Sequence, residues 1–508
     1  MVNATTPVNS VTQIRFTHYQ VSDERLFTIL ELKSTSVPFL VDTSVCKIPH
    51  IDPFDKSLNI LMVGVDSISR NNMLRYMKKT WTYFVNKLNA IDLRGYNKVA
   101  DNTFPNIVPM TTGKYVDQLS WNESIRWMPM DKFNFIWNNY SAKGYRTLYA
   151  EDHPNIAIFD FKKSGFKIPP GDYFNRPLSV AMEKTKKVWN SKHYCVHGRT
   201  ETDIVLDYLK NFAQMFQSKP HFSFTFFSRL THDYLEGTYK ADTIFLNFFR
   251  DMFESDNLKN TVIFFFSDHG MRFGNFRETF VGKLEERLPF MLIVFPQWFR
   301  KKYPDIHRNL QINARRLTTP FDIFATLEHI LDFNGIEKKE VKKKRSMNLF
   351  NEIPEDRTCD DAGILPHWCT CSKLETLDIE NKTVLTIGHT MVSKINQDLK
   401  DSFDVCEKLY LKTIKYALRV TPPNKRTRNI VKNRNVVYGD RVKSYIGYQI
   451  TVQTKPGDAI FEGTLRFDEK GKTYHSVGDV SRINKYGGQS QCIEEHHLKK
   501  LCYCKIQS

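Results

Sequence analysis

The sequence predicts an α/β protein in which helices flank a central, mostly parallel sheet, followed by a smaller, β-rich domain that carries cysteines. Apolar runs of strand length alternate with helical patterns over residues 58–355, which is typical of a parallel sheet with helices on both faces. After residue 356, turn signals separate short segments of alternating polarity. We therefore expect a lead-in over residues 1–57 that packs on the core, a main domain over 58–355 and a smaller domain over 356–508.

Five apolar runs predict the strands of the main sheet. They cover residues 59–65, 145–149, 221–227, 261–266 and 290–295. A run that is apolar on both faces is typical of a strand buried in a parallel sheet. Helical patterns over residues 73–88, 239–253 and 319–331 indicate the layers that would cover this sheet.

Polar side chains follow four of these strands at the point where each strand ends. They are Asp66, then Asp152 and His153, then His232 and Asp233, and finally Asp268 and His269. In an open α/β sheet, ligands collect beyond the carboxyl ends of the strands. This convergence of titratable groups indicates an enzyme.

The segment Ser267-Asp268-His269-Gly270 directly follows an apolar strand. A carboxylate and an imidazole side by side can both bind a divalent cation where the chain turns sharply, and Gly270 permits such a turn. Asp66, at another strand end, is a further candidate ligand. The alternatives are an ordinary turn for the first segment and a helix cap for Asp66.

A threonine precedes Phe104 and Pro105 in the segment that begins at Asn102. Pro105 suits the first turn of a helix, which places Thr103 at the helix N-terminus. Backbone N–H groups and the helix dipole favour an anion there. A hydroxyl held against a metal at this point would lose its proton more readily and become a nucleophile. The simpler alternative is that Thr103 only caps the helix.

Taken together, these three signals resemble the alkaline phosphatase superfamily, which includes sulfatases and phosphodiesterases. Further stretches are similar to the family called "domain of unknown function 229", namely residues 65–70, 101–106, 151–154, 285–290, 357–364 and 367–371. The resemblance spans residues 40–505 and implies an alkaline phosphatase/sulfatase-like fold. It also implies a divalent ion bound by Asp66, Thr103, Asp268 and His269, with Thr103 as the nucleophile. Zinc is the first expectation and manganese or magnesium the alternative, with one or two ions.

The residue at position 103 bears on the reaction. Sulfatases need a Cys or Ser that becomes formylglycine, and Thr103 cannot supply that aldehyde. The resemblance therefore favours phosphate esters, as a phosphodiesterase or a transferase of phosphorylated headgroups. A sulfatase-like ester hydrolase and a catalytically silent glycan- or lipid-binding relative are the alternatives, and a broken ligand set would mark the silent form.

A second metal site is less clearly indicated. Two-metal relatives carry an Asp-x-x-x-His pattern, and no clean example lies between Thr103 and Asp268. Candidates for substrate binding or a second metal are His232, Asp233, Asp152, His153 and Arg287. Arg287 would grip a phosphate oxygen. The alternatives are a structural histidine at a sheet edge for His232 and a surface salt bridge for Arg287.

The net charge of +17 favours anionic partners. We expect a phosphorylated or otherwise anionic substrate, including a glycan or lipid headgroup, and no specific nucleic-acid binding. The basic run from Lys338 to Arg345 and the stretch from Asn424 to Arg434 indicate solvated loops.

The cysteines and the glycosylation sequons indicate the cellular compartment of the protein. Two clusters, Cys359 to Cys371 and Cys492 to Cys504, lack the Cys-x-x-Cys spacing of a zinc site, which favours disulfides. Four glycosylation sequons begin at Asn3, Asn122, Asn139 and Asn381. No apolar stretch approaches the ~20 residues of a membrane helix, and the N-terminus is too polar for a signal peptide. We expect an extracellular or secretory-lumen protein, with any membrane association through a segment absent here.

Overall fold

The computed structural model describes residues 57–184, 195–196, 198–335, 345–421, 447–468 and 470–505. It also describes the backbone of a three-stranded antiparallel sheet, formed by β1 (Ile14–Ser22), β2 (Arg25–Leu32) and β3 (Phe39–Asp42). The predicted packing of the lead-in, the basic run up to residue 344 and the stretch 424–434 lie outside the described residues.

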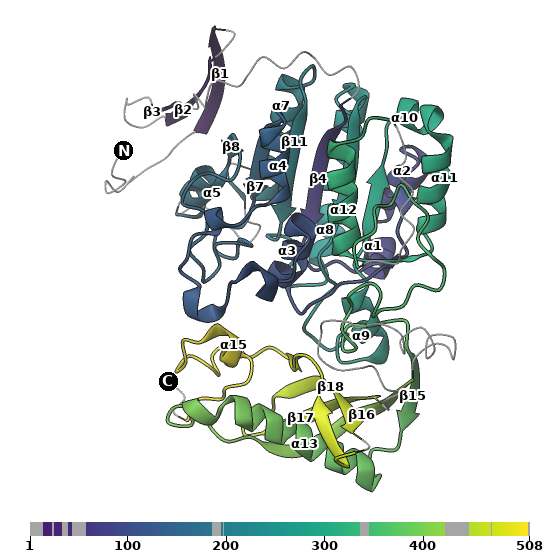
Figure 1. The fold of residues 1–508 in the computed structure, drawn as a ribbon. Helices are drawn as coiled ribbons and strands as arrows, with labels where there is room; N and C mark the ends of the chain where they lie inside the picture. The colour runs from purple at the N-terminus through teal and green to yellow at the C-terminus, as the bar shows by residue number, and fades with distance from the viewer. Residues whose placement is uncertain are drawn as a thin grey trace.

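The main sheet has seven strands in the order β5-β13-β12-β4-β11-β7-β8 (Figure 1). The strands are β4 (Asn59–Val65), β5 (Ile91–Asp92), β7 (Arg146–Glu151), β8 (Tyr173–Phe174), β11 (His221–Phe227), β12 (Thr261–Phe266) and β13 (Met291–Val294). The pairs β12–β4, β4–β11, β11–β7 and β7–β8 are all parallel, whereas β13 runs antiparallel to both of its neighbours. The predicted mostly parallel α/β sheet is therefore confirmed.

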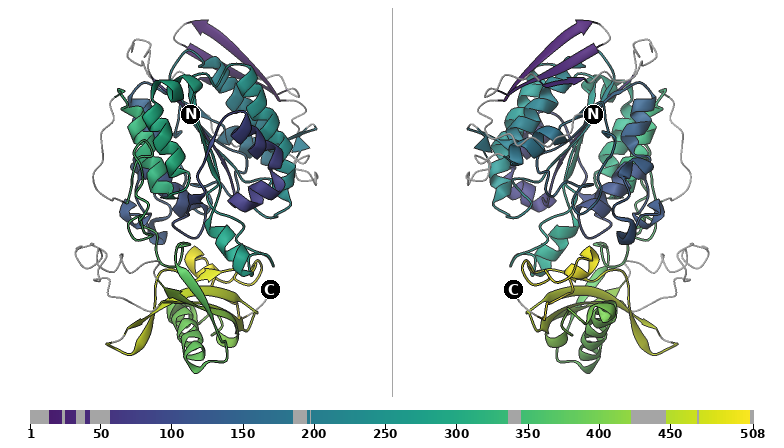
Figure 2. Two further views of the ribbon diagram at one scale, coloured as in Figure 1. Left: turned by 90° about the vertical axis from the view of Figure 1, so that its right-hand side faces the viewer. Right: turned by 90° about the vertical axis from the view of Figure 1, so that its left-hand side faces the viewer.

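Helices cover both faces of this sheet (Figure 2). One layer holds α1 (Arg70–Tyr76), α2 (Lys78–Asn86), α7 (Glu201–Met215) and α8 (Gly237–Glu254), and the other holds α3 (Thr103–Thr112), α4 (Ile136–Ala142) and α12 (Pro320–Leu331). The other α-helices in the described part of the main domain are α5 (Arg176–Glu183), α9 (Phe280–Arg287), α10 (Gln297–Lys302) and α11 (Pro304–Asn313). The helix predicted over residues 73–88 is two helices, because Met77 leaves the helical conformation between α1 and α2.

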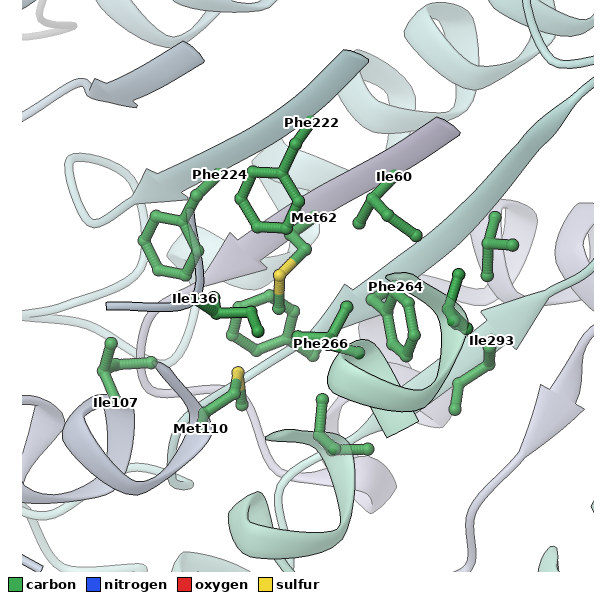
Figure 3. Close-up of a cluster of buried hydrophobic side chains, with 14 of the residues drawn as sticks. Ile60, Met62, Ile107, Met110, Ile136, Phe222, Phe224, Phe264, Phe266 and Ile293 are labelled. Carbon is green, nitrogen blue, oxygen red and sulfur yellow. The ribbon is translucent and has the colours of Figure 1, made fainter. Parts of the chain in front are cut away.

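The core explains why the strand runs are apolar throughout. Side chains two residues apart share one face of a strand, so Phe222 and Phe224 of β11 point toward the layer that contains α3 (Figure 3). Ile107 and Met110 of α3 belong to the same buried cluster on this side of the sheet. All four side chains are fully buried. The intervening residues of β4 and β12 face the opposite helix layer, which gives each strand two buried faces.

The C-terminal part is an antiparallel sheet backed by a helix. Its strands are β15 (Lys373–Leu377), β16 (Tyr410–Thr421), β17 (Gly447–Lys455), β18 (Ile460–Asp468), β19 (Thr473–Ser476) and β20 (Ser481–Arg482), and its helices are α13 (Lys382–Asp398) and α15 (His496–Lys499). The disulfides Cys359–Cys369, Cys406–Cys502 and Cys492–Cys504 confirm the prediction of disulfide bonding in this part. The exact domain boundaries stay predictions. Each helix in the described part of the chain is too short or too polar to cross a bilayer.

A buried carboxylate joins the two parts. Glu462 of β18 is fully buried, and its Oε1 lies 2.6 Å from Arg287 and 3.2 Å from Arg277 of the main domain. Its Oε2 lies 3.5 Å from the ammonium of Lys283 and accepts a hydrogen bond of 3.1 Å from Tyr416. The three cations belong to the segment that follows Asp268 and His269, so β18 holds that segment in place.

Replacing Glu462 by Gln should destabilise the protein strongly. The change leaves three buried cations without their shared carboxylate, and breaking such a network costs about 3 kcal/mol or more. Denaturant unfolding measures the loss, and Glu375→Gln on the exposed side of β15 is the matched control. Equal stability of Glu462→Gln and the parent would contradict this role.

Candidate active site

Two adjacent strands bring the predicted ligands together. β4 and β12 pair in parallel with Gly64 opposite Phe266, so their carboxyl ends meet at one edge of the sheet. Asp66 follows β4, and Asp268 and His269 follow β12. All three side chains are buried, and one ligand atom from each lies within 4.8 Å of the others. Among the described residues, this is the one such group made of carboxylates and imidazole.

The Thr103 hydroxyl faces the same cluster. Its Oγ1 lies 3.4 Å from Nε2 of His269, and that Nε2 lies 3.1 Å from Oδ2 of Asp268 and 3.9 Å from Oδ1 of Asp66. The structure therefore brings together all four residues that the sequence singled out as ligands, although they come from three separate stretches of the chain.

Serines hold the two strand ends in register. Ser67 adopts a left-handed backbone conformation with φ of 64°, which is uncommon for a residue with a side chain. In this conformation its N–H donates to Oδ1 of Asp268 at 3.3 Å, and its hydroxyl donates to Oδ1 of Asp66 at 2.9 Å. The Oγ of Ser267 in turn accepts from the N–H of Ile68 at 2.9 Å. These bonds orient both carboxylates.

Backbone contacts set the chemistry of His269. Its Nδ1 lies 2.9 Å from the carbonyl oxygen of Gly270, which can only accept, so Nδ1 carries the proton and Nε2 presents a lone pair. Burial, followed by the charges of Arg272 and Lys98, holds the pKa of His269 well below its usual value. Gly270 is needed for space rather than for an unusual φ, because a Cβ there would lie 2.4 Å from the carbonyl oxygen of Glu285.

The donor set fits a divalent cation. Nε2 of His269 and Oδ2 of Asp268 are both hydrogen-bond acceptors, and the two atoms lie only 3.1 Å apart. Oδ2 is buried without a hydrogen-bond partner. Burial and the nearby charge of Asp66 raise the pKa of Asp268, while a hydrogen bond from Thr103 lowers it in part. Buried acceptors this close repel one another unless a cation or a proton lies between them. Two carboxylates, one imidazole and one hydroxyl are a suitable oxygen and nitrogen set for such an ion.

Asn106 fixes the start of α3 and therefore the position of Thr103. Its buried side-chain oxygen accepts from the N–H groups of Val99 at 2.8 Å and Ala100 at 3.1 Å. Its side-chain nitrogen donates to the carbonyl oxygens of Ala100 and Asn102, both at 2.9 Å. The loop before the helix is thus closed onto its first turn, and the Thr103 hydroxyl lies at the positive end of the helix dipole.

His232 and Asp233 form a hydrogen-bonded pair beyond β11. Nδ1 of His232 lies 2.9 Å from Oδ1 of Asp233, and the two side chains are 39% and 57% exposed. Burial lowers the pKa of His232, but the bond to Asp233 and the charge of Asp66 outweigh this effect and raise it above its usual value. The imidazolium of His232 is therefore favoured beside the cluster, with Nε2 directed away from Asp233.

The remaining candidates have other surroundings. The oxygens of Asp152 already accept from the Thr202 hydroxyl at 2.7 Å and the Ser228 N–H at 2.8 Å, which holds the turn after β11. Burial and the charge of Arg229 lower the pKa of His153 to about 3, so its imidazole is neutral. Arg287 was expected to grip a phosphate, but it is fully buried against Glu462 at the domain junction.

Sequence reasoning missed three charged residues next to Thr103 and His269. Arg272 donates to Oδ2 of Asp101 at 2.9 Å, and the ammonium of Lys98 donates to the backbone oxygen of Asp101, also at 2.9 Å. Lys98 is fully buried against Glu286, and burial lowers its pKa to about 8. The position of Arg272, three residues after His269, and that of Asp101, at the start of the family-like stretch 101–106, were available signals, whereas no pattern marks Lys98.

Comparison with known proteins gives the family. Residues 28–415 match the family described as Protein of unknown function (DUF229), and the chain belongs to this family, as its sequence predicted. A search of curated proteins found no match.

Several solved structures are similar at low identity. A phosphonate monoester hydrolase from Silicibacter pomeroyi is 11% identical over 82% of this chain and 90% of that chain, with a TM-score of 0.42. A protein in the alkaline phosphatase superfamily from Vibrio parahaemolyticus is 11% identical over 88% and 86%, with a TM-score of 0.39. The lipoteichoic acid synthase LtaP from Listeria monocytogenes is 11% identical over 50% and 70%, with a TM-score of 0.33. Likeness at this level says nothing about what this chain acts on.

Replacing Asp268 by Asn should weaken metal binding by about a hundredfold or more, because a neutral amide replaces the buried charge. A zinc titration against a competing chelator measures the affinity, with circular dichroism as the test of folding. Asp233→Asn is the control, since Asp233 contacts His232 outside the cluster. Full zinc affinity in a folded Asp268→Asn protein would remove Asp268 from the ligand set.

Proposed function

We propose that this chain is a metal-dependent hydrolase or transferase of phosphate esters in which Thr103 is the nucleophile. The observation that supports this most is the position of the Thr103 hydroxyl, 3.4 Å from Nε2 of His269 at the N-terminus of α3. An oxygen there lies beside the ligand cluster, at the positive end of the helix dipole.

The four clustered residues would bind the metal, with zinc as the first expectation and manganese or magnesium as the alternatives. A bound divalent ion would lower the pKa of the Thr103 hydroxyl and stabilise negative charge on the transferred group. Asp66, Asp268 and His269 are preorganised for this by Ser67, Ser267 and the carbonyl of Gly270.

The reaction would proceed by double displacement. The hydroxyl proton of Thr103 would pass to solvent, and Oγ1 would form a bond to phosphorus as the bond from phosphorus to the leaving oxygen breaks and the leaving oxygen takes up a proton. His232 would donate that proton, a role supported by its raised pKa and by the contact of Asp233 with Nδ1, which leaves Nε2 to face the leaving oxygen. Attack by water would then restore Thr103 in hydrolysis, and attack by a second alcohol would do so in transfer.

Phosphate is favoured over sulfate because Thr103 has no route to formylglycine. The intact set of Asp66, Thr103, Asp268 and His269 argues against a catalytically silent relative. The three disulfides support an extracellular or secretory-lumen location, as do the exposed sequon residues Asn122 and Asn381.

Thr103→Ala should lower kcat for an aryl phosphodiester by at least about a thousandfold, because the attacking oxygen is lost. Thr103→Ser keeps that oxygen and is the matched control, with measurable activity expected. Initial rates on a panel of aryl phosphodiester, phosphate monoester and sulfate give the measurement and test the preference for phosphate. Undiminished turnover by pure Thr103→Ala would exclude the proposed nucleophile.

His232→Gln should slow substrates with a poor alkyl leaving group by about a hundredfold, with much less effect on a nitrophenyl leaving group that needs no proton. The folded-state pKa of His232 is raised above its usual value, so its protonated form extends to higher pH than that of a free imidazole and is lost as pH rises through the raised pKa. In the parent, a plot of kcat against pH for the alkyl substrate should therefore fall at alkaline pH. In His232→Gln this alkaline decrease should be absent. Equal losses for both leaving groups would argue against proton donation.

A further inference from the structure

The C-terminal part reaches the candidate active site through the segment 481–486. The hydroxyl of Ser481 donates to Oδ1 of Asp101 at 3.3 Å, two residues before Thr103. The ring of Tyr486 lies 6.3 Å from that of Phe273, in the segment that follows His269. The segment therefore borders the start of α3 and the loop after β12.

One residue of this segment also borders the loop after β11. The ammonium of Lys485 lies 5.0 Å from the ring centroid of Tyr234, next to the pair of His232 and Asp233. The hydrogen bond from His232 holds the pKa of Asp233 below its usual value, and the charge of Lys485 contributes in the same direction. Lys485 is thus within electrostatic reach of Asp233, the hydrogen-bond partner of the group proposed to protonate the leaving oxygen.

The segment carries two positive charges, Arg482 and Lys485, that form no close ion pair with a described carboxylate. Arg482 is buried, and its guanidinium donates to neutral acceptors, the side-chain oxygens of Asn484 at 2.6 Å and Gln489 at 2.9 Å. Lys485 is exposed, and neither Arg482 nor Lys485 forms an ion pair within the part of the chain that the structure covers. Arg272, by contrast, is paired with Asp101. Of the two, Lys485 lies near the pair of His232 and Asp233.

Tyr234 presents a flat apolar surface at the same place. Its side chain is 63% exposed, which is high for a large aromatic residue at a site between two domains. The face of the Tyr234 ring that Lys485 does not cover can stack on the ring of a ligand, and the neighbouring ammonium attracts an anionic substituent on that ligand.

We propose that Tyr234 and Lys485 form a subsite for the leaving alcohol, and that it selects a cyclic alcohol bearing an anionic substituent, such as an acidic sugar. This inference rests on the proposed function. The leaving oxygen must lie near His232 to receive a proton from it, so the rest of the leaving alcohol would extend toward Tyr234. There the ammonium of Lys485 would attract the anionic substituent of the alcohol. The C-terminal part would then determine specificity.

The test uses two methyl aryl phosphodiesters that differ only in charge. One releases 4-hydroxy-3-nitrobenzoate and the other its uncharged analogue 4-hydroxy-3-nitrobenzamide. We expect the parent to prefer the carboxylate in kcat/KM, mainly through a lower KM. Lys485→Met should reduce this carboxylate-to-amide ratio about tenfold, Lys485→Glu should reduce it further, and salt should weaken the preference in the parent.

Lys470→Met, on an exposed turn of the same domain, is the matched control and should leave the ratio unchanged. Tyr234→Ala should raise KM for both substrates, because ring stacking is lost for each. No preference in the parent, or an unchanged ratio in Lys485→Met, would overturn the subsite.

A binding measurement separates this inference from the proposed function. If the parent turns over neither diester, the proposed function fails, and the subsite is judged by calorimetric binding of 4-hydroxy-3-nitrobenzoate alone. Binding that weakens about tenfold in Lys485→Met and not in Lys470→Met supports the subsite. Absence of binding, or equal binding by both variants, overturns it.

Discussion

The close approach of buried acceptors from two neighbouring strands governs this site. His269 presents a lone pair toward Oδ2 of Asp268 at 3.1 Å, and the carboxylate of Asp66 adds a second charge. None of these groups can reach bulk water to relieve the repulsion, because all are buried. The fold therefore maintains a small volume of strong negative potential, and a cation is the simplest means of balancing it. The Thr103 hydroxyl shares that volume because Asn106 closes the loop onto α3.

The same electrostatic logic connects the two parts of the molecule. Residues that follow the Asp268-His269 pair carry three buried cations, and these meet the carboxylate of Glu462 on β18. The C-terminal sheet thus holds the chain directly after the ligand pair, and its segment 481–486 lies beside Asp101 and Phe273. In this arrangement the smaller domain is part of the site's framework, and the candidate active site lies where two separately built sheets meet.

Much of the fold could be predicted because its signals are local. Strand β12 is an unbroken apolar run, and the period of the apolar residues marks α12. Asp66, Asp268 and His269 could be identified because each ends such a run and a parallel sheet brings its strand ends together. Arg287 shows the limit, since its sequence context suited a phosphate ligand equally well, and only burial against Glu462 separates the two roles. The break at Met77 was equally hidden, because the apolar pattern runs on through it.

The layered α/β architecture, the ligand types at the strand ends and the threonine in place of the Cys or Ser of sulfatases can all be recognised from the order of the residues. These follow from residue chemistry and from spacings of two to four residues, which act within one element. Tertiary structure alone decided which carboxylate faces which imidazole nitrogen, which arginine is buried, and that Lys485 lies over Tyr234 although 251 positions separate them. Such pairings depend on how completed sheets and loops pack together, and packing across a domain junction leaves no periodic trace in the chain.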